Sequence, residues 1–168
     1  LFKEQLLSEI NLSCHEKIFT AHENISKFDF NDFCNFDRPY AKTFLNLVSP
    51  YISNLGSILG YEELFIQSFW FQQYYKNDLH GWHNHDQCNY SNVYFLELPD
   101  SEVRTQFYDI HQNEVFAFKD IKEGSLLTFP AHFVHCSPVN KTNKRKTIIA
   151  FNTSYNKVNI DFINEKIR

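Results

Sequence analysis

Glycine is scarce in this sequence, with four residues in 168. Loops that cradle phosphate groups need several glycines at fixed spacing, and neither G-x-G-x-x-G nor G-x-x-x-x-G-K-[ST] occurs. The sequence therefore argues against a nucleotide-binding loop of either kind.

Long apolar runs and an excess of positive charge are missing as well. No run approaches the ~18 apolar residues that a membrane span needs, and the N-terminal stretch LFKEQLLSEI is amphipathic and carries acids, unlike a signal peptide. The net charge of −4 and the pI near 6.0 argue against a nucleic-acid-binding surface built on positive charge. We expect neither a membrane nor a nucleic acid as a partner.

The cysteines form no C-x-x-C pair and no zinc-finger spacing. They are Cys14, Cys34, Cys88 and Cys136. A disulfide-stapled secreted scaffold has a denser pattern in a shorter chain. We expect reduced thiols and a cytoplasmic location.

Aromatic residues, in contrast, are abundant at 17%, with 18 Phe and 9 Tyr. The length fits a single domain, 1–168. We interpret residues 1–60 as a helical N-terminal support, because apolar residues fall at helical spacing in 1–10 and again after Pro39. Pro39 fits the first turn of the second helix, with Asp37 as its N-cap, and Gly60 fits the end of that helix. The stretch 15–37 between them reads as irregular.

From Tyr61 onward the pattern changes to short, aromatic and β-branched runs separated by turn signals. Helices followed by about six to eight strands suggest a mainly β fold with N-terminal helices. We predict a double-stranded β-helix (jelly roll, cupin-like) over residues 61–156.

The stretch HGWHNHD places His83 and His85 two positions apart at the entrance to a predicted strand. Side chains at i and i+2 of an extended segment point to the same side. His135 follows the predicted strand SLLTFP, and imidazole nitrogens suit Fe, Zn, Cu and Ni. The pattern indicates a metal site, with a polar strand end as the alternative for the pair alone.

Arg145 begins the last long predicted strand, ten positions after His135. A guanidinium grips a carboxylate at two points, so Arg145 could hold the far end of a dicarboxylate that chelates the metal. If Arg145 faces inward, alternation turns Lys144 and Lys146 outward. A charged strand edge is the alternative.

Three segments, WHNHDQCNYSNVYFLELP, GSLLTFPAHFVHCSP and RKTIIAFN, together resemble the 2-oxoglutarate- and Fe(II)-dependent oxygenases of the double-stranded β-helix fold. They are similar to the W-H-x-H, G-x-L-x-x-F-P-x-x-x-x-H and R-x-x-[IL]-x-F-N segments of a phage and bacterial subgroup. The resemblance runs from about Phe69 to Asn152.

This resemblance implies a dioxygenase, and in particular a hydroxylase, that uses Fe(II), 2-oxoglutarate and O2 on an unidentified substrate. It implies His83, His85 and His135 as the catalytic metal ligands. It also implies Arg145 as the partner of the distal 2-oxoglutarate carboxylate.

Two features near the ligands stay open. Tyr94, or Tyr74 on the preceding predicted strand, could add a phenol to the cosubstrate site. The superfamily usually has His-x-Asp or His-x-Glu, so His85 leaves the metal site one unit more positive than usual. Asp86 points away from the face of His83 on a regular strand, but a bulge could re-aim it, so Asp86 is an alternative ligand.

We do not expect the neighbouring aromatic and sulfur-bearing side chains to bind the metal. His80 is out of phase with His83, and we interpret it as loop surface. Trp70 and Trp82 read as core residues, and Cys136 alternates away from His135.

Other functions remain open. A cupin-like dioxygenase with three histidines would need no 2-oxoglutarate, although cupins usually add a Glu that DQCNYSN lacks. A non-catalytic jelly-roll module could hold a metal or nothing. The N-terminal region could form a lid or a homodimer surface, and a virus-encoded protein acting in the host cytoplasm is one alternative for its origin.

Overall fold

The computed structural model describes residues 2–29 and 37–167, and Cys34 lies outside them. The elements in chain order are α1 (Phe2–Leu12), β1 (Glu16–Phe19), β2 (Glu23–Phe28), α2 (Pro39–Ile58), β3 (Tyr61–Tyr74), β4 (Leu79–His83), β5 (Tyr90–Glu97), the 3-10 turn η1 (Ser101–Val103), β6 (Gln106–Asp109), β7 (Glu114–Phe116), β8 (Leu126–Pro130), β9 (His135–Ser137), β10 (Lys146–Val158) and α3 (Ile160–Ile167).

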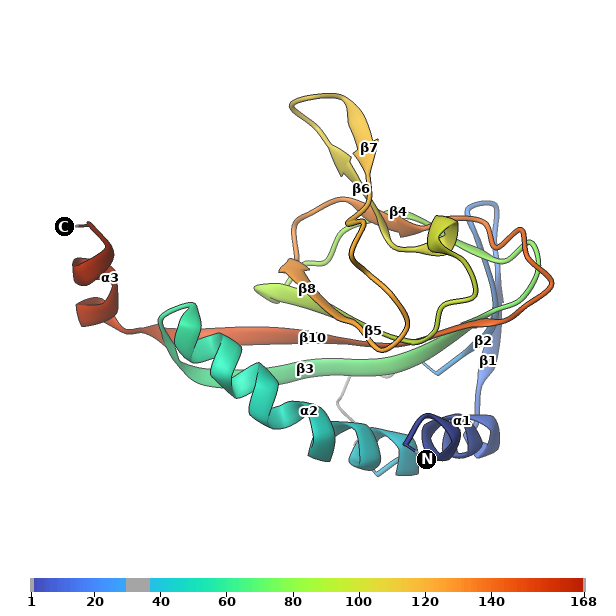
Figure 1. Ribbon diagram of the computed structural model, residues 1–168, viewed down its shortest axis with the longest axis horizontal. Helices are drawn as coiled ribbons and strands as arrows, with labels where there is room; N and C mark the ends of the chain where they lie inside the picture. The colour runs from blue at the N-terminus through green and yellow to red at the C-terminus, as the bar shows by residue number, and fades with distance from the viewer. Residues whose placement is uncertain (1, 30–36, 168) are drawn as a thin grey trace.

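The strands form one strongly curled antiparallel sheet in the order β7-β6-β9-β4-β2-β3-β10-β5-β8, with β1 paired to β2. Helices α1 and α2 lie on one side of the sheet, and the β6–β7 hairpin stands out from the other side (Figure 1). The predicted class, mainly β with N-terminal helices in a double-stranded β-helix, is confirmed. None of the helices in the described ranges has both the length and the apolar character needed to cross a membrane.

Helix α2 begins where its sequence predicts. Pro39 occupies the first turn, where its missing N–H is tolerated. The residue at the N-cap is Arg38, without a side-chain capping bond, so the prediction of Asp37 as the cap is wrong. The helix continues through Pro50, and Gly60 follows its end with φ 81°, a left-handed conformation that glycine adopts without strain.

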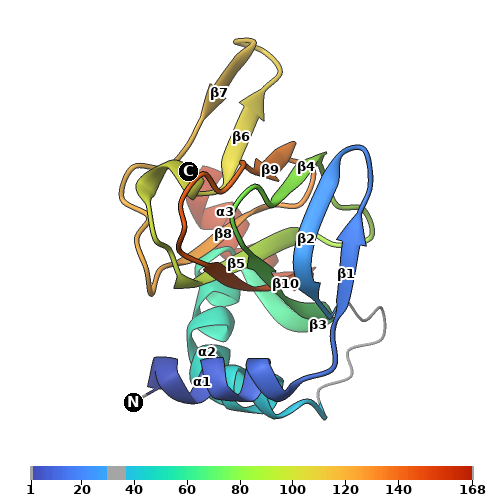
Figure 2. The same cartoon turned by 90° about the vertical axis from the view of Figure 1, so that its right-hand side faces the viewer.

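Residues 16–28 form β1 and β2 instead of the irregular segment that the sequence suggests. These strands are short and mixed in polarity, so local alternation carries little signal. Their order comes from pairing: β2 bonds to β1 along one edge, and along the other edge its start bonds to β4 and its end to β3. The β1–β2 hairpin thereby lies against the strand that carries His83 (Figure 2).

Two apolar clusters cover the two faces of the sheet. One packs between the sheet and helices α1 and α2, and the other fills the interior of the curled sheet. Strand β10 contributes Ile149 and Phe151 to the first cluster and Ile148 and Ala150 to the second. Because β10 is buried on both faces, the side on which each of its residues lies is fixed by packing, and this decides the geometry of the site.

Candidate metal centre

Three histidine rings converge on the inner side of the sheet. His83 lies directly opposite His135 in the antiparallel pair of β4 and β9. The backbone N–H of His85 donates to the carbonyl of Ala131 at 2.9 Å, which extends this pairing beyond β4. One potential ligand atom from each of the three rings lies within 4.8 Å of the others. The structure therefore brings together the three histidines that the sequence pattern singles out.

The chain around these rings alternates as expected for an extended segment. His83 and His85 are partly buried, whereas Trp82, Asn84 and Asp86 are exposed. Asp86 therefore lies on the outer side, which favours His85 as the second ligand. Trp82 is 48% exposed, so its interpretation as a core residue is wrong.

Backbone carbonyls orient two of the rings. The Nδ1 atom of His83 lies 2.8 Å from the carbonyl oxygen of Gly81, and Nδ1 of His135 lies 2.8 Å from that of Phe133. A carbonyl only accepts hydrogen bonds, so both Nδ1 atoms carry the proton and donate. The Nε2 atom of each ring is left with a free lone pair, the state that a metal ligand requires.

His85 has an amide partner instead of a carbonyl. Its Nδ1 atom lies 3.4 Å from the side-chain amide nitrogen of Asn152, whose amide oxygen accepts from the Ser91 hydroxyl at 2.9 Å. The serine hydroxyl can donate or accept, so either orientation of the amide is satisfied. The amide oxygen facing Nδ1–H would free the Nε2 atom of His85 for a metal, which gives Asn152 an orienting contact.

All three rings are neutral at pH 7. Burial lowers the pKa of His135 to about 3 and that of His85 to about 4, and the proximity of His83 adds to both effects. Burial also lowers the pKa of His83. Neutral imidazoles are the form that binds metals, so the cluster needs no deprotonation step near neutral pH.

His80 belongs to the wall of this cavity and not to the loop surface, which corrects its interpretation from the sequence. Its ring stacks on that of His83 with centroids 4.0 Å apart. Its Nε2 atom lies 2.9 Å from a carboxylate oxygen of Glu23, and its Nδ1 atom lies 3.3 Å from the amide nitrogen of Gln72. Strict alternation along the strand would turn His80 away from the side on which His83 lies. A register irregularity between His80 and His83 in the β4–β9 pair returns the His80 ring to that inner side.

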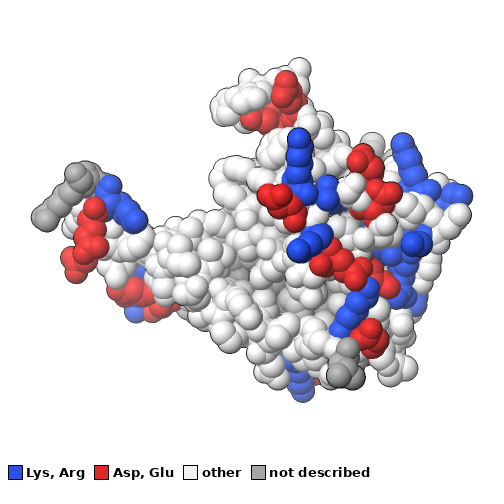
Figure 3. Space-filling model, viewed as in Figure 1, with Lys and Arg blue, Asp and Glu red and all other residues white. Residues whose placement is uncertain are grey.

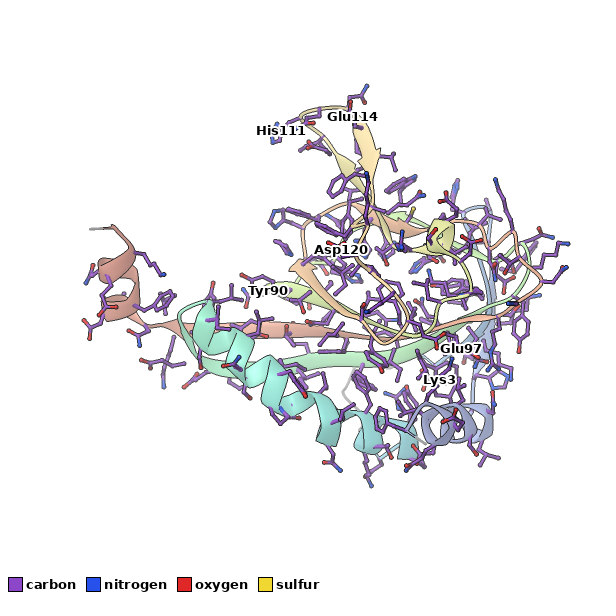
Figure 4. The ribbon with its side chains drawn as sticks, viewed as in Figure 1. Lys3, Tyr90, Glu97, His111, Glu114 and Asp120 are labelled. Carbon is purple, nitrogen blue, oxygen red and sulfur yellow. The ribbon has the colours of Figure 1, made fainter. Side chains whose placement is uncertain are left out.

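Arg145 does not face the cavity, so the prediction that it points inward is wrong. Its guanidinium pairs with both carboxylate oxygens of Glu97, at 2.7 and 3.0 Å, and lies 3.3 Å from the side-chain oxygen of Asn11 on α1. Glu97 lies on the side of the sheet that carries α1 (Figure 4). Arg145 therefore joins the sheet to the N-terminal helix, and this geometry contradicts its assignment to a cosubstrate carboxylate.

The next residue, Lys146, takes the inward position that Arg145 was expected to hold. Its side chain is 1% exposed, donates to the Ser137 hydroxyl at 2.7 Å, and lies with its ammonium 5.1 Å from the centre of the Tyr74 ring. Among the residues that the structure describes, no carboxylate lies within ion-pair distance of it. Burial lowers the pKa of Lys146 to about 7. A buried cation without a counter-ion is costly, which suggests that an anionic ligand binds here.

The two tyrosines suggested for the cosubstrate site lie on opposite faces of the sheet. Tyr74 lines the cavity beside Lys146 and donates to the side-chain oxygen of Gln72 at 2.7 Å. Tyr94 packs on α2, with its ring 5.0 Å from that of Phe44, and therefore faces away. The structure favours Tyr74 and contradicts Tyr94.

The β6–β7 hairpin rises beside the cluster. Phe107 at its base lies opposite His135 in the β6–β9 pair, with ring centroids 6.2 Å apart. Acidic side chains gather at the tip of the hairpin, where Glu114 and His111 lie (Figures 3 and 4). The hairpin also exposes apolar residues, among them Ile110 at 67%. The hairpin therefore presents both apolar and acidic side chains beside the cluster.

Comparison by sequence alone places the chain in no group, since no protein-family model and no curated protein matches it. Its structure is similar to several solved ones. An oxidoreductase of the 2OG-Fe(II) oxygenase family from Burkholderia pseudomallei aligns with TM-score 0.73 and 16% identity over 90% of this chain and 77% of that one. A prolyl-4-hydroxylase from Pseudomonas putida aligns with TM-score 0.62 and 12% identity over 91% and 86%.

A third similar structure is a prolyl hydroxylase from Trichoplax adhaerens in complex with a peptide of hypoxia inducible factor. It aligns with TM-score 0.65 and 14% identity over 92% of this chain and 77% of that one. At such identities the similarity establishes the architecture. The chain has the double-stranded β-helix fold of the 2-oxoglutarate- and Fe(II)-dependent oxygenases.

Proposed function

We propose that the protein is an Fe(II)- and 2-oxoglutarate-dependent dioxygenase that acts as a hydroxylase. One observation carries the proposal: ligand atoms of three neutral imidazoles lie within 4.8 Å of one another, and the buried ammonium of Lys146 contacts Ser137 and Tyr74 of the same cavity wall, with no carboxylate partner among the described residues. The first feature suits a metal and the second suits one end of a dicarboxylate. The similarity of fold supports the pairing of these two ligands.

The ligand set fits Fe(II). Imidazole nitrogens bind iron, and three protein ligands leave positions open for a chelating cosubstrate and dioxygen. Bound iron would supply the activation of O2, the step that protein side chains do not perform. The chain's own contribution is to orient His83 and His135 through backbone carbonyls and His85 through Asn152, so that one ligand atom from each ring lies within 4.8 Å of the others.

Lys146 is proposed to hold the distal carboxylate of 2-oxoglutarate, in place of Arg145. An ammonium is a compact charge with three donors, and the hydroxyl of Ser137 beside it can share the same carboxylate. The open space between the side chains is about 30 Å³, room for one or two waters. We therefore expect Lys146 and neighbouring side chains such as Gln72 to change rotamer when the dicarboxylate enters.

The test is production of succinate. Protein loaded with Fe(II) and supplied with 2-oxoglutarate and air should form succinate slowly even without its substrate. His135→Ala should abolish metal binding, and Lys146→Met should abolish 2-oxoglutarate binding in calorimetry while metal binding persists. Lys144→Met, the exposed neighbour, is the matched control and should behave as wild type. Wild-type protein that binds Fe(II) but neither binds nor consumes 2-oxoglutarate would refute the proposal.

The neutral ligand set itself favours a second candidate, a cupin-like dioxygenase that needs no cosubstrate. Such an enzyme has no use for a buried unpaired lysine, and this observation weighs against it. Oxygen consumption that depends on iron but not on 2-oxoglutarate would favour the second candidate.

Two further properties belong to the proposal. The exposed apolar residues of α2, among them Tyr51 at 69% and Ile58 at 60%, support a homodimer, which light scattering would test. The free thiols of Cys14, Cys88 and Cys136 support a reducing, cytoplasmic location, which fractionation of the producing cells would test.

A further inference from the structure

The ligand set of the proposed metal centre lacks negative charge, and the following inference rests on that centre. Among the described residues the cluster offers only imidazole donors. A divalent cation bound there would keep its full charge in a partly buried site, which costs free energy unless a negative group lies nearby. The structure contains such a group outside the ligand set.

Glu23 is held against the strand that carries the ligands. It pairs with His80 in the β2–β4 ladder, and its carboxylate oxygen lies 2.9 Å from Nε2 of His80. The hairpin approaches so closely that a Cβ at Gly81 would lie 2.6 Å from the backbone oxygen of His22. Gly81 in turn provides the carbonyl that orients His83. The β1–β2 hairpin is therefore packed directly on the backbone that positions a ligand.

The charge of Glu23 is not cancelled by its partner. The Tyr74 hydroxyl donates to the side-chain oxygen of Gln72, so the amide nitrogen of Gln72 is the group that faces Nδ1 of His80, and it can only donate. A neutral His80 donates from Nε2 to the carboxylate and accepts at Nδ1 from the Gln72 amide, so both ring nitrogens are satisfied. The contact is therefore a hydrogen bond from a neutral ring to a carboxylate, and not an ion pair.

That charge acts on the ligand cluster. The ring of His80 stacks on that of His83 at 4.0 Å between centroids and 21° between planes. The hydrogen bond to His80 and this stacking together place the Glu23 carboxylate one ring away from a proposed ligand. Asp86 is the next residue after His85, but its side chain is exposed. The carboxylate fixed by pairing and hydrogen bonding is that of Glu23.

We propose that Glu23 is a positioning residue that supplies, through His80, the negative charge that a three-histidine metal centre lacks. It would do so without touching the metal. Binding of the metal and docking of the β1–β2 hairpin are then linked, since each favours the other to the same extent.

The experiment is a titration of the metal-free protein with Co(II), monitored by its absorption, without 2-oxoglutarate. Glu23→Gln keeps an oxygen that accepts from His80 but removes the charge, so it separates electrostatics from hydrogen bonding. We expect Co(II) affinity to fall about 10- to 100-fold, the range typical of groups that orient metal ligands. Glu16→Gln, an exposed acid on the same hairpin, is the control and should bind as wild type.

Two further measurements respond to the charge and to the linkage. The midpoint potential of bound iron should rise in Glu23→Gln and stay unchanged in Glu16→Gln. Co(II) should slow amide hydrogen exchange of β1 and β2 in the wild type. Wild-type Co(II) affinity in Glu23→Gln would overturn this inference alone, whereas a wild-type protein that binds no Co(II) would overturn the metal centre and with it this inference.

Discussion

Replacing Lys146 by methionine should make the protein more stable while removing its proposed cosubstrate site. Lys146 is 1% exposed and has no carboxylate partner among the described residues. Methionine has a similar length, fills the same space beside the Tyr74 ring and carries no charge. The substitution therefore removes the cost of burying an ammonium and leaves the packing nearly unchanged.

The magnitude follows from the pKa of Lys146, which burial lowers from 10.5 to about 7. Each pH unit corresponds to about 1.4 kcal/mol, so the folded state bears a penalty of about 4 kcal/mol at pH 7. Ser137 loses its donor in the variant, which costs about 1–2 kcal/mol. We expect a net gain of about 2–3 kcal/mol in the free energy of unfolding, or about 5–10 °C in Tm.

The sign of the pH dependence provides a second check. The folded pKa of Lys146 lies below the unfolded one, so the unfolded chain binds more protons between pH 7 and 10.5. Wild-type stability should therefore rise with pH across this window. The Lys146→Met variant should lack that rise.

The assay is urea unfolding of metal-free protein at pH 7 and pH 9. Wild type, Lys146→Met and the exposed control Lys144→Met are compared, and 2-oxoglutarate binding is measured on the same samples. A Lys146→Met protein that is less stable than wild type at pH 7, or that keeps the wild-type pH dependence, would refute the reasoning. It would mean that the ammonium has a partner or solvent access that lowers its cost.

Three other substitutions test separate parts of the structure. Arg145→Leu removes an outer ion pair, so we expect a loss of up to about 1 kcal/mol in urea unfolding and unchanged 2-oxoglutarate affinity; weaker binding would restore the role first expected of Arg145. Asn152→Leu removes the contact with Nδ1 of His85, so Co(II) affinity should fall about 10-fold, and wild-type affinity would show that the amide does not orient the ring. Gly56→Ala would place a Cβ 2.8 Å from the buried Tyr155 ring. It should therefore lower the free energy of unfolding by about 1–2 kcal/mol despite the better helix propensity of alanine, and equal stability would mean that the ring moves aside.

The sequence predicted the architecture well because its signals were local. Pro39 and Gly60 mark the ends of α2, and the aromatic runs after Tyr61 coincide with strands. The strands β1 and β2 escaped prediction because their order depends on β3 and β4, which lie far along the chain. No window around residues 16–28 contains that information.

The histidine cluster was predictable for the same reason, and the inward position of Lys146 was not. Around His83 and His85 one face of the segment is exposed, so polar and less polar residues alternate and the sequence shows which side chains point inward. Strand β10 is buried on both faces and has apolar residues at both Ile148 and Ile149. The sequence of such a strand does not show which of two neighbouring side chains points to which face. The run of cations at 144–146 then offers several candidates for one inward position, and packing selects Lys146.

The two unusual features of the cavity, a neutral ligand set and an unpaired lysine, have one physical explanation. Each is unfavourable alone: a dication among imidazoles has no negative ligand, and the ammonium of Lys146 has no counter-ion among the residues that the structure describes. A dicarboxylate bridging the two would bring one negative charge to each. We therefore expect metal and 2-oxoglutarate to bind with positive cooperativity, and the coupling should disappear in Lys146→Met but persist in Arg145→Leu. Calorimetric titration of 2-oxoglutarate with and without Co(II) measures this coupling, and equal affinities in the wild type would contradict it.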